Sequence, residues 1–220
     1  MPPLFLVNHR IISLQKERYI ISSCAIGNNI VLKNNEVLFI EQSASIQSFL
    51  LSVYQYLKTD YPKFYKMDNL SKLGWLASEV LLNDENIQQF NPEKIGLVLS
   101  NADASLDADL KYFQSIKEIP SPALFVYTLP NIVIGEICIR NKFKGENAFF
   151  IFEDFNAKFI SEYVNNLFDN NIIELCICGW INAMEDDYKA VLYLVSAGKE
   201  KDNLLFTEVN MNSIFKRLEK

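Results

Sequence analysis

The chain has 220 residues, 50% hydrophobic and 22% charged, which is enough to bury a full core and excludes a disordered protein. Its formal net charge of -6 argues against a nucleic-acid partner, because affinity for a phosphate backbone rests on clustered Lys and Arg. Its seven glycines are few for a protein built on phosphate-cradling loops. No run reaches the roughly 18 apolar residues of a membrane helix, and the first ten residues do not resemble a leader, so we expect a soluble cytoplasmic protein.

The hydrophobic periodicity alternates between strand and helix along the chain. In chain order it predicts a strand at 18–27, a turn at Asn28 and Asn29, a hairpin at 30–40, helices at 43–58 and 67–84, a strand at 94–100, helices at 106–116 and 131–141, a strand at 147–152, a helix at 155–169 and strands at 172–180 and 188–198. No repeat or flexible linker interrupts this order, so we expect one α/β domain around a mostly parallel or mixed sheet.

Three of the predicted helices carry recognisable start signals. Ser43 or Ser45 is expected to cap the first helix, and Asp68 the second. Pro130 suits the first position of the helix at 131–141, with residue 128 or 129 near the cap.

The four cysteines are expected to be reduced, buried and structural. Cys24, Cys138, Cys176 and Cys178 stand in apolar surroundings and lack the spacing of a disulfide framework. Cys176 and Cys178 would share one face of a strand, but a metal site needs about two more ligands and His9 is the single histidine. We therefore expect no metal and no other cofactor.

The segment 149–155 reads FFIFEDF, in which a strand-like run ends at Glu153 and Asp154 before helical spacing begins. The end of a buried strand that opens into a helix is a common place for a nucleophile or a ligand in α/β enzymes. One interpretation makes the two acids a general acid/base couple, with Asn156 as a third polar group in the same turn. The favoured interpretation is structural, because acids in the first turn of a helix complement its positive end and cap free amides.

Other polar residues give weaker signals. Asp103, Asp107 and Asp109 lack the glycine and terminal glutamate of a calcium loop, so a solvated helix start is expected. Ser100 and Ser121 have no histidine partner for a catalytic triad. An aromatic group between the first two helices could bind a partner, but core packing is the favoured role: Tyr54, Tyr56, Tyr61, Phe64 and Tyr65.

Four stretches together resemble one protein family. They cover residues 64–82, 94–116, 120–152 and 170–183, and they occur in the order and spacing of the amino-terminal half of β-ketoacyl-acyl-carrier-protein synthases, members of the thiolase-like superfamily. The third stretch, PSPALFVYTLPNIVIGEICIRNKFKGENAFFIF, is the most specific, because one run matches Pro122, Phe125, Thr128, Pro130, Asn131, Gly135 and Gly145. The resemblance covers about residues 19–198. It implies an α/β thiolase-like half-fold, a mixed and mostly parallel sheet with helices on both faces, in a single domain over residues 1–220.

The resemblance also exposes a departure from the family. Counting back from Gly179 places the position of the cysteine nucleophile at Asp154, and no cysteine lies within fifteen residues of it. A carboxylate would form a reactive mixed anhydride where the family stores a thioester on a thiolate. The basic residues of the family's decarboxylative step come from a carboxy-terminal half, whereas His9 lies ahead of the matched region. The resemblance therefore implies a non-catalytic partner of a ketosynthase, similar to the chain length factors of fatty acid, polyketide or aryl polyene biosynthesis.

The strand before the nucleophile supplies the dimer interface in the resembled family, here about Asn147 to Phe152. Alternation along it would direct Phe149 and Ile151 to one side and Phe150 and Phe152 to the other. Either set would face the partner's acyl tunnel or interface. Phe150 and Phe152 form the bulkier set, and the resemblance implies that phenylalanines near a tunnel end limit product length.

Two alternatives to a ketosynthase partner stay open. One is a hydrolase or decarboxylase that acts on acyl thioesters through Glu153, Asp154 and Asn156. The other is a homodimeric module that binds acyl-carrier protein without chemistry. A homo- or heterodimer is expected in either non-catalytic case.

Overall fold

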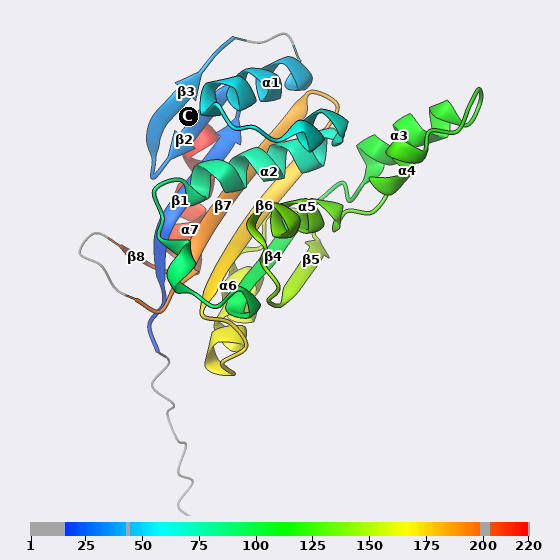
Figure 1. Ribbon diagram of the computed structural model, residues 1–220. Helices are drawn as coiled ribbons and strands as arrows, with labels where there is room; N and C mark the ends of the chain where they lie inside the picture. Colours follow the sequence, from blue (N-terminus) through cyan, green and yellow to red (C-terminus); the bar gives the residue numbers. More distant parts are fainter. Residues whose placement is uncertain (1–15, 43–44, 199–202, 220) are drawn as a thin grey trace, which may run out of the picture.

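The computed structural model describes residues 16–42, 45–198 and 203–219. Within these residues, one sheet of eight strands runs in the order β3-β2-β1-β7-β6-β4-β5, with β8 paired to β1 (Figure 1). The strands are β1 (Tyr19–Gly27), β2 (Ile30–Lys33), β3 (Glu36–Ile40), β4 (Ile95–Asn101), β5 (Asn147–Ile151), β6 (Leu175–Met184), β7 (Asp187–Ser196) and β8 (Leu204–Leu205). The helices are α1 (Ile46–Leu57), η1 (Pro62–Lys66), α2 (Asn69–Leu82), η2 (Ile87–Gln89), η3 (Pro92–Lys94), α3 (Leu106–Ser115), α4 (Pro122–Val126), α5 (Ile132–Asn141), α6 (Ala157–Asp169), α7 (Glu208–Phe215) and η4 (Lys216–Glu219).

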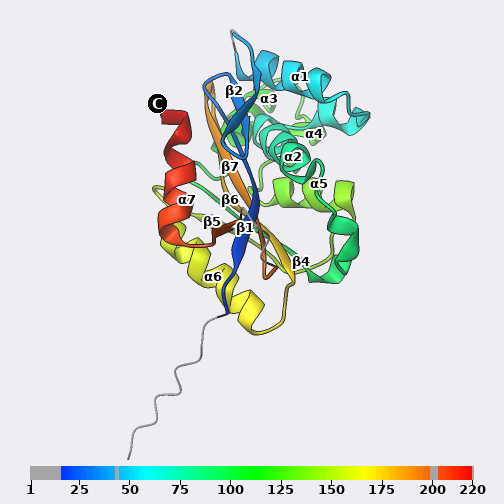
Figure 2. The ribbon, with the colours of Figure 1, turned by 90° about the vertical axis from the view of Figure 1, so that its left-hand side faces the viewer.

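Helices cover both faces of the sheet, as predicted. Helices α1, α2 and α5 lie on one face, and α6 and α7 lie on the other, so that Figure 2 shows three layers with the sheet in the middle. Each face has its own hydrophobic cluster. All seven residues of β4 are buried, in agreement with a strand covered on both sides.

The sheet is mixed, but parallel pairing is the minority. Strand β4 pairs in parallel with β5 and with β6, whereas the pairings of β1 with β2, β7 and β8, of β2 with β3 and of β6 with β7 are antiparallel. The expectation of a mostly parallel sheet is wrong in this respect. The physical reason is the short connections: tight turns join β1 to β2, β2 to β3 and β6 to β7, and a tight turn can only reverse the chain.

The two amino-terminal hairpins close through asparagine pairs. Asn28 and Asn29 adopt φ of 50° and 60°, and Asn34 and Asn35 adopt 51° and 68°. Asparagine tolerates this left-handed backbone better than most residues, and two such residues in succession match the twist of a hairpin. The predicted turn at residues 28–29 and the predicted hairpin at 30–40 are confirmed.

Two of the three predicted helix caps are confirmed. The Ser45 side chain accepts from the Ser48 N–H, and Asp68 accepts from the Ser71 N–H. Ser43 lies outside the described residues. The third prediction is wrong: the Ile132 N–H donates to the Leu129 carbonyl, so Pro130 lies inside a turn and α5 begins two residues later, after Asn131.

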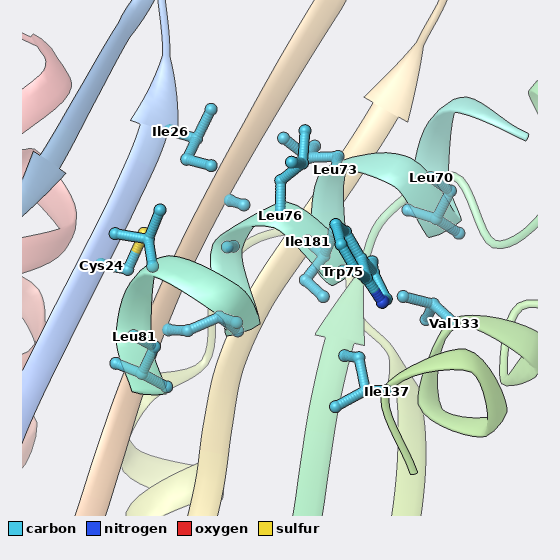
Figure 3. Packing of buried hydrophobic residues seen from close by; sticks show 14 of the residues in the cluster. Cys24, Ile26, Leu70, Leu73, Trp75, Leu76, Leu81, Val133, Ile137 and Ile181 are labelled. Atoms are coloured by element: carbon cyan, nitrogen blue, oxygen red, sulfur yellow. The ribbon is translucent and has the colours of Figure 1, made fainter. Parts of the chain in front are cut away.

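Helix α2 is the most deeply buried helix of the described chain. Eleven of its residues are buried, because α1, α5 and η1 cover the sides that do not face the sheet. Figure 3 shows Leu73 and Leu76 directed toward Ile26 on β1, and Trp75 close to Val133 and Ile137 of α5. A helix that is apolar on nearly every side is expected only inside a core.

The aromatic group between α1 and α2 is mainly a packing element, as favoured from the sequence. Tyr54 and Phe64 are buried and stack at 4.2 Å between ring centroids, and Tyr61 stacks on Trp75 at 5.2 Å. The guanidinium of Arg140 lies over the Tyr61 and Trp75 rings and forms a bidentate ion pair with Glu79 of α2. Tyr56 and Tyr65 remain exposed.

The outer side of α6 is polar. Lys158, Glu162 and Asn166 are exposed there, while Ile160, Val164 and other apolar residues of α6 face the sheet.

None of the helices described here has both the length and the hydropathy that crossing a membrane requires.

Gly179 provides a test of the close approach of β6 and β7. Its φ is +147°, and a Cβ built there would lie 2.1 Å from the Val191 carbonyl oxygen. Gly179→Ala is expected to lower the free energy of unfolding by roughly 3 kcal/mol, the order of backbone strain plus overpacking. Chemical denaturation followed by circular dichroism measures this change.

Gly135→Ala is the matched control, because a Cβ at this position in α5 meets nothing within 4 Å. It is expected to be neutral or to stabilise by about 0.5 kcal/mol, since alanine favours a helix over glycine. Equal stability of the two variants would contradict the assigned packing of β6 against β7.

Candidate functional site at the carboxyl end of β5

The candidate site lies where β5 leaves the sheet. The Phe152 N–H still donates to the Asn101 carbonyl of β4 at 2.9 Å, and the chain then bends through Glu153 and Asp154 before α6 begins. Residues 152–156 are called the acid loop below. Both carboxylates are exposed.

The acid pair does not cap α6. The Asn156 side chain accepts from the Phe159 N–H at 2.9 Å, and the first turn of the helix contains no acidic residue. The favoured explanation of Glu153 and Asp154 as helix-capping acids is therefore wrong, because α6 begins about two residues later than expected. A short polar side chain before the helix, Asn156, meets the same physical need.

Phe155 of the acid loop packs against aromatic rings of α7 and of the sheet. Phe155 stacks on Phe215 of α7 with ring centroids 4.6 Å apart, and it also contacts Trp180 and Tyr193 of the sheet. An open depression with a volume of about 340 Å³ lies at the acid loop. It is lined by the acid loop, Ala157, Lys158, Glu208 and Asn212. Its polar lining is mainly acidic, with Glu153, Asp154 and Glu208 against Lys158.

A second polar network follows the neighbouring strand β4. The Asn182 amide oxygen accepts from the N–H groups of Ala102 and Asp103, and its amide nitrogen donates to Asp103 at 2.7 Å. A solvated helix start was predicted at Asp103, Asp107 and Asp109. The prediction is wrong for Asp107, which is buried and whose carboxylate lies 2.5 Å from the Lys111 ammonium nitrogen. The sequence carried no signal for Asn182, since its role depends on β6 lying beside β4.

The two serines considered for catalysis have structural roles. The buried Ser100 hydroxyl donates to the Gly179 carbonyl at 3.2 Å. The Ser121 hydroxyl accepts from the Leu124 N–H and starts α4, a helix that was not predicted although its Ser-Pro opening is a typical start signal.

No thiol of the chain lies at the acid loop. All four cysteines are free; Cys24, Cys176 and Cys178 are buried, as predicted, and Cys138 is half-buried. Burial raises the pKa of the Cys138 thiol to about 11, and burial followed by the neighbouring Cys176 raises the pKa of Cys178 well above its ordinary value. Thiols with raised pKa are poor nucleophiles near neutral pH. His9 lies outside the described residues.

The side chains of β5 alternate as predicted. Phe149 packs against the cluster under α2, whereas Phe150 and Phe152 pack against the cluster under α6. On that side, Phe150 meets the Phe159 ring at 4.8 Å and the Tyr163 ring at 5.1 Å. Ile151 is 48% exposed, because β5 is the last strand of the sheet.

Comparison with known proteins gives matches among solved structures alone. No protein-family model and no curated protein matches the chain. The ishigamide ketosynthase/chain length factor superposes with a TM-score of 0.59 at 14% identity, over 84% of this chain and 63% of that chain. The complex of a ketosynthase (ApeO) with its chain length factor (ApeC) from Xenorhabdus doucetiae gives 0.54 at 12% identity, over 80% and 77%.

A β-ketoacyl synthase from Burkholderia phymatum STM815 gives a TM-score of 0.53 at 11% identity, over 82% of this chain and 59% of that chain. The chain thus spans about 63% of the length of the ishigamide protein, and similarity at this level of identity concerns the fold. The α/β architecture built around β4, β5 and β6 is the thiolase-like fold of ketosynthases and chain length factors, as the sequence resemblance predicted.

Proposed function

We propose that this chain is a single-domain, non-catalytic, ketosynthase-like subunit that pairs with a ketosynthase in fatty acid, polyketide or aryl polyene biosynthesis in the cytoplasm. One observation carries the proposal. The fold is that of ketosynthases, but the exposed carboxylate of Asp154 stands at the position that the family resemblance assigns to the nucleophilic cysteine.

The chemistry of acyl transfer supports a non-catalytic role. A thiolate stores an acyl group as a thioester, whereas a carboxylate in the same place would form a mixed anhydride that water destroys. The acidic lining of the depression beside Asp154 would also repel the carboxylate of a malonyl group. The four thiols of the chain lie elsewhere and are buried or half-buried.

Two exposed features suit the binding of a second subunit. The first is the outer edge of β5, where an unpaired strand offers backbone groups to another chain. The second is the arm formed by α3 and α4, which projects past the β5 end of the sheet (Figure 1). Eight large apolar residues are exposed on this arm and its connections: Leu106, Leu110, Phe113, Ile116, Ile119, Phe125, Val126 and Leu129.

The comparisons support a ketosynthase as the partner. One solved structure of similar fold is itself a ketosynthase in complex with its chain length factor, and another pairs a type II ketosynthase with its acyl-carrier protein. A group of large exposed apolar residues, such as the eight on the α3–α4 arm, is typical of a protein interface. In the proposed complex, Phe149 to Phe152 lie at the interface, and Phe150 and Phe152 limit the length of the acyl product.

Co-expression with a ketosynthase encoded nearby tests the pairing. The two chains are expected to elute together from a size-exclusion column at micromolar concentration. Ile151→Lys is expected to weaken the complex at least about tenfold, because a lysine on the free edge opposes strand pairing.

The matched control is Val37→Lys, which places the same charge on β3, the opposite edge of the sheet, where Val37 is 63% exposed. It is expected to leave the elution profile unchanged. Separate elution of the two wild-type chains would contradict the proposed pairing and favour a homodimeric module that binds acyl-carrier protein.

Substitution of Asp154 tests the non-catalytic role. The purified chain is expected to cleave or decarboxylate acyl thioesters at the same background rate as Asp154→Ala and as Glu162→Ala, an exposed acid on α6. Mass spectrometry of acyl-carrier-protein substrates measures the product. Turnover by the wild-type chain that Asp154→Ala abolishes and Glu162→Ala preserves would establish a hydrolase or decarboxylase using Glu153, Asp154 and Asn156.

A further inference from the structure

The α3–α4 arm is attached to the sheet at the end of β4. It projects beyond β5 in Figure 1, and its two helices pack on each other, with the Tyr112 and Phe125 ring centroids 5.3 Å apart. The parallel pairing of β4 with β6 ends at Ser100 and Trp180. The direction of the arm therefore depends on the groups that hold residues 101–105, where the chain leaves the sheet.

Asn182 of β6 holds the first two residues that follow β4. Its amide oxygen accepts from the Ala102 N–H at 3.2 Å and from the Asp103 N–H at 3.1 Å. Its amide nitrogen donates to the Asp103 carboxylate at 2.7 Å. An ionised acceptor makes this last bond stronger than a hydrogen bond between neutral groups. One side chain thus extends the contact between the two strands past the end of their backbone ladder.

Asn101 folds the same connection into a tight turn. Its buried side chain donates to the Ala104 carbonyl at 2.8 Å and accepts from the Ala104 N–H at 3.1 Å. Ala104 adopts φ of 49°, a left-handed conformation that alanine rarely takes and that persists only where the surrounding structure imposes it. The Ser105 hydroxyl donates to the Thr128 carbonyl at 3.0 Å and joins the beginning of the arm to its end. The arm is therefore one body attached through a turn of defined shape.

Other contacts hold the arm less directionally. Ala108 of α3 and Tyr127 are buried in the cluster under α2, but apolar packing is non-directional. The Glu185 N–H, in the turn between β6 and β7, donates to Asp107 of α3 at 3.4 Å, which is longer than an ordinary hydrogen bond. The three bonds of Asn182 therefore provide the main directional anchor of the arm.

A fixed arm matters for the proposed pairing because the partner has to meet two surfaces at once. The free edge of β5 belongs to the sheet, whereas exposed apolar residues such as Leu110, Phe113 and Phe125 belong to the arm. An arm that already has its bound direction loses less conformational entropy on association.

We infer that Asn182 is a positioning residue, which fixes the direction of the α3–α4 arm for the binding of a ketosynthase. This inference rests on the proposed function. It deepens that function by naming a half-buried residue of the sheet, away from the exposed apolar side chains, that controls the affinity for the partner.

Exchanging the two polar side chains tests the inference. Asn182→Asp alone would bring two carboxylates together in place of the 2.7 Å bond, and their repulsion is expected to release the arm at neutral pH. In the double variant, Asn182→Asp with Asp103→Asn, the new carboxylate accepts from both N–H groups and from the new amide, so all three bonds are restored. Asp103→Asn alone is expected to have little effect, because an amide can turn its oxygen toward Asn182.

The direction of the arm is measured on the chain alone, as the distance distribution between spin labels at Glu118→Cys on the arm and Lys158→Cys on α6, in a Cys138→Ser background. Both label positions are exposed, and the remaining thiols are buried. Asn182→Asp is expected to broaden the distribution, and the double variant is expected to return it to the wild-type width. Equal widths in all variants, or a double variant as broad as Asn182→Asp, would overturn the inference.

The affinity for the ketosynthase is measured in parallel. Asn182→Asp is expected to raise the dissociation constant at least about fivefold, and the double variant is expected to restore the wild-type value. The matched control is Asn170→Asp, the same change at an exposed asparagine that ends α6, which should alter neither the width nor the affinity. Failure of the wild-type chain to bind a ketosynthase would refute the proposed function and, with it, this role of Asn182. Wild-type binding that Asn182→Asp leaves unchanged would refute the role of Asn182 alone.

Discussion

Burial of the central strands on both faces is the constraint on which the rest of the structure depends. Strands β4, β6 and β7 carry almost continuous apolar sequence, so each face of the sheet needs a layer of helices. Helix α2 supplies most of the cover on one side, and α6 and α7 supply it on the other. The cover becomes incomplete at β5, whose residues are half-buried or exposed, and the candidate site lies at this margin.

Much of the fold is readable in the sequence because local signals and burial agree. The asparagine turns, the caps Ser45 and Asp68 and the apolar runs of β4 and β6 each follow from short-range chemistry. The errors have a different origin. Pro130 fits either a helix start or a turn, and α4 and α7, although capped by Ser121 and Thr207, are too short to give a clear helical period.

The local structure around the candidate site was predicted in part. The periodicity placed Glu153 and Asp154 directly after a strand, and they follow β5 in the structure. The capping role was assigned to the wrong residues, because sequence patterns define helix ends only to within one or two positions. The network of Asn182 with Asp103 was not foreseen, since it joins two segments that are distant in the chain and adjacent only after the sheet has formed.

The polar outer side of α6 has a consequence for how this fold can be extended. A further layer of protein stacked on Lys158, Glu162 and Asn166 would strip water from two charged groups and an amide, which costs free energy unless that layer supplies polar partners. Lengthening the sheet sideways from β5 would instead replace water on the backbone groups of the strand edge with hydrogen bonds between strands. The fold therefore accommodates additional strands beside β5 more readily than an additional layer of protein on the outer side of α6.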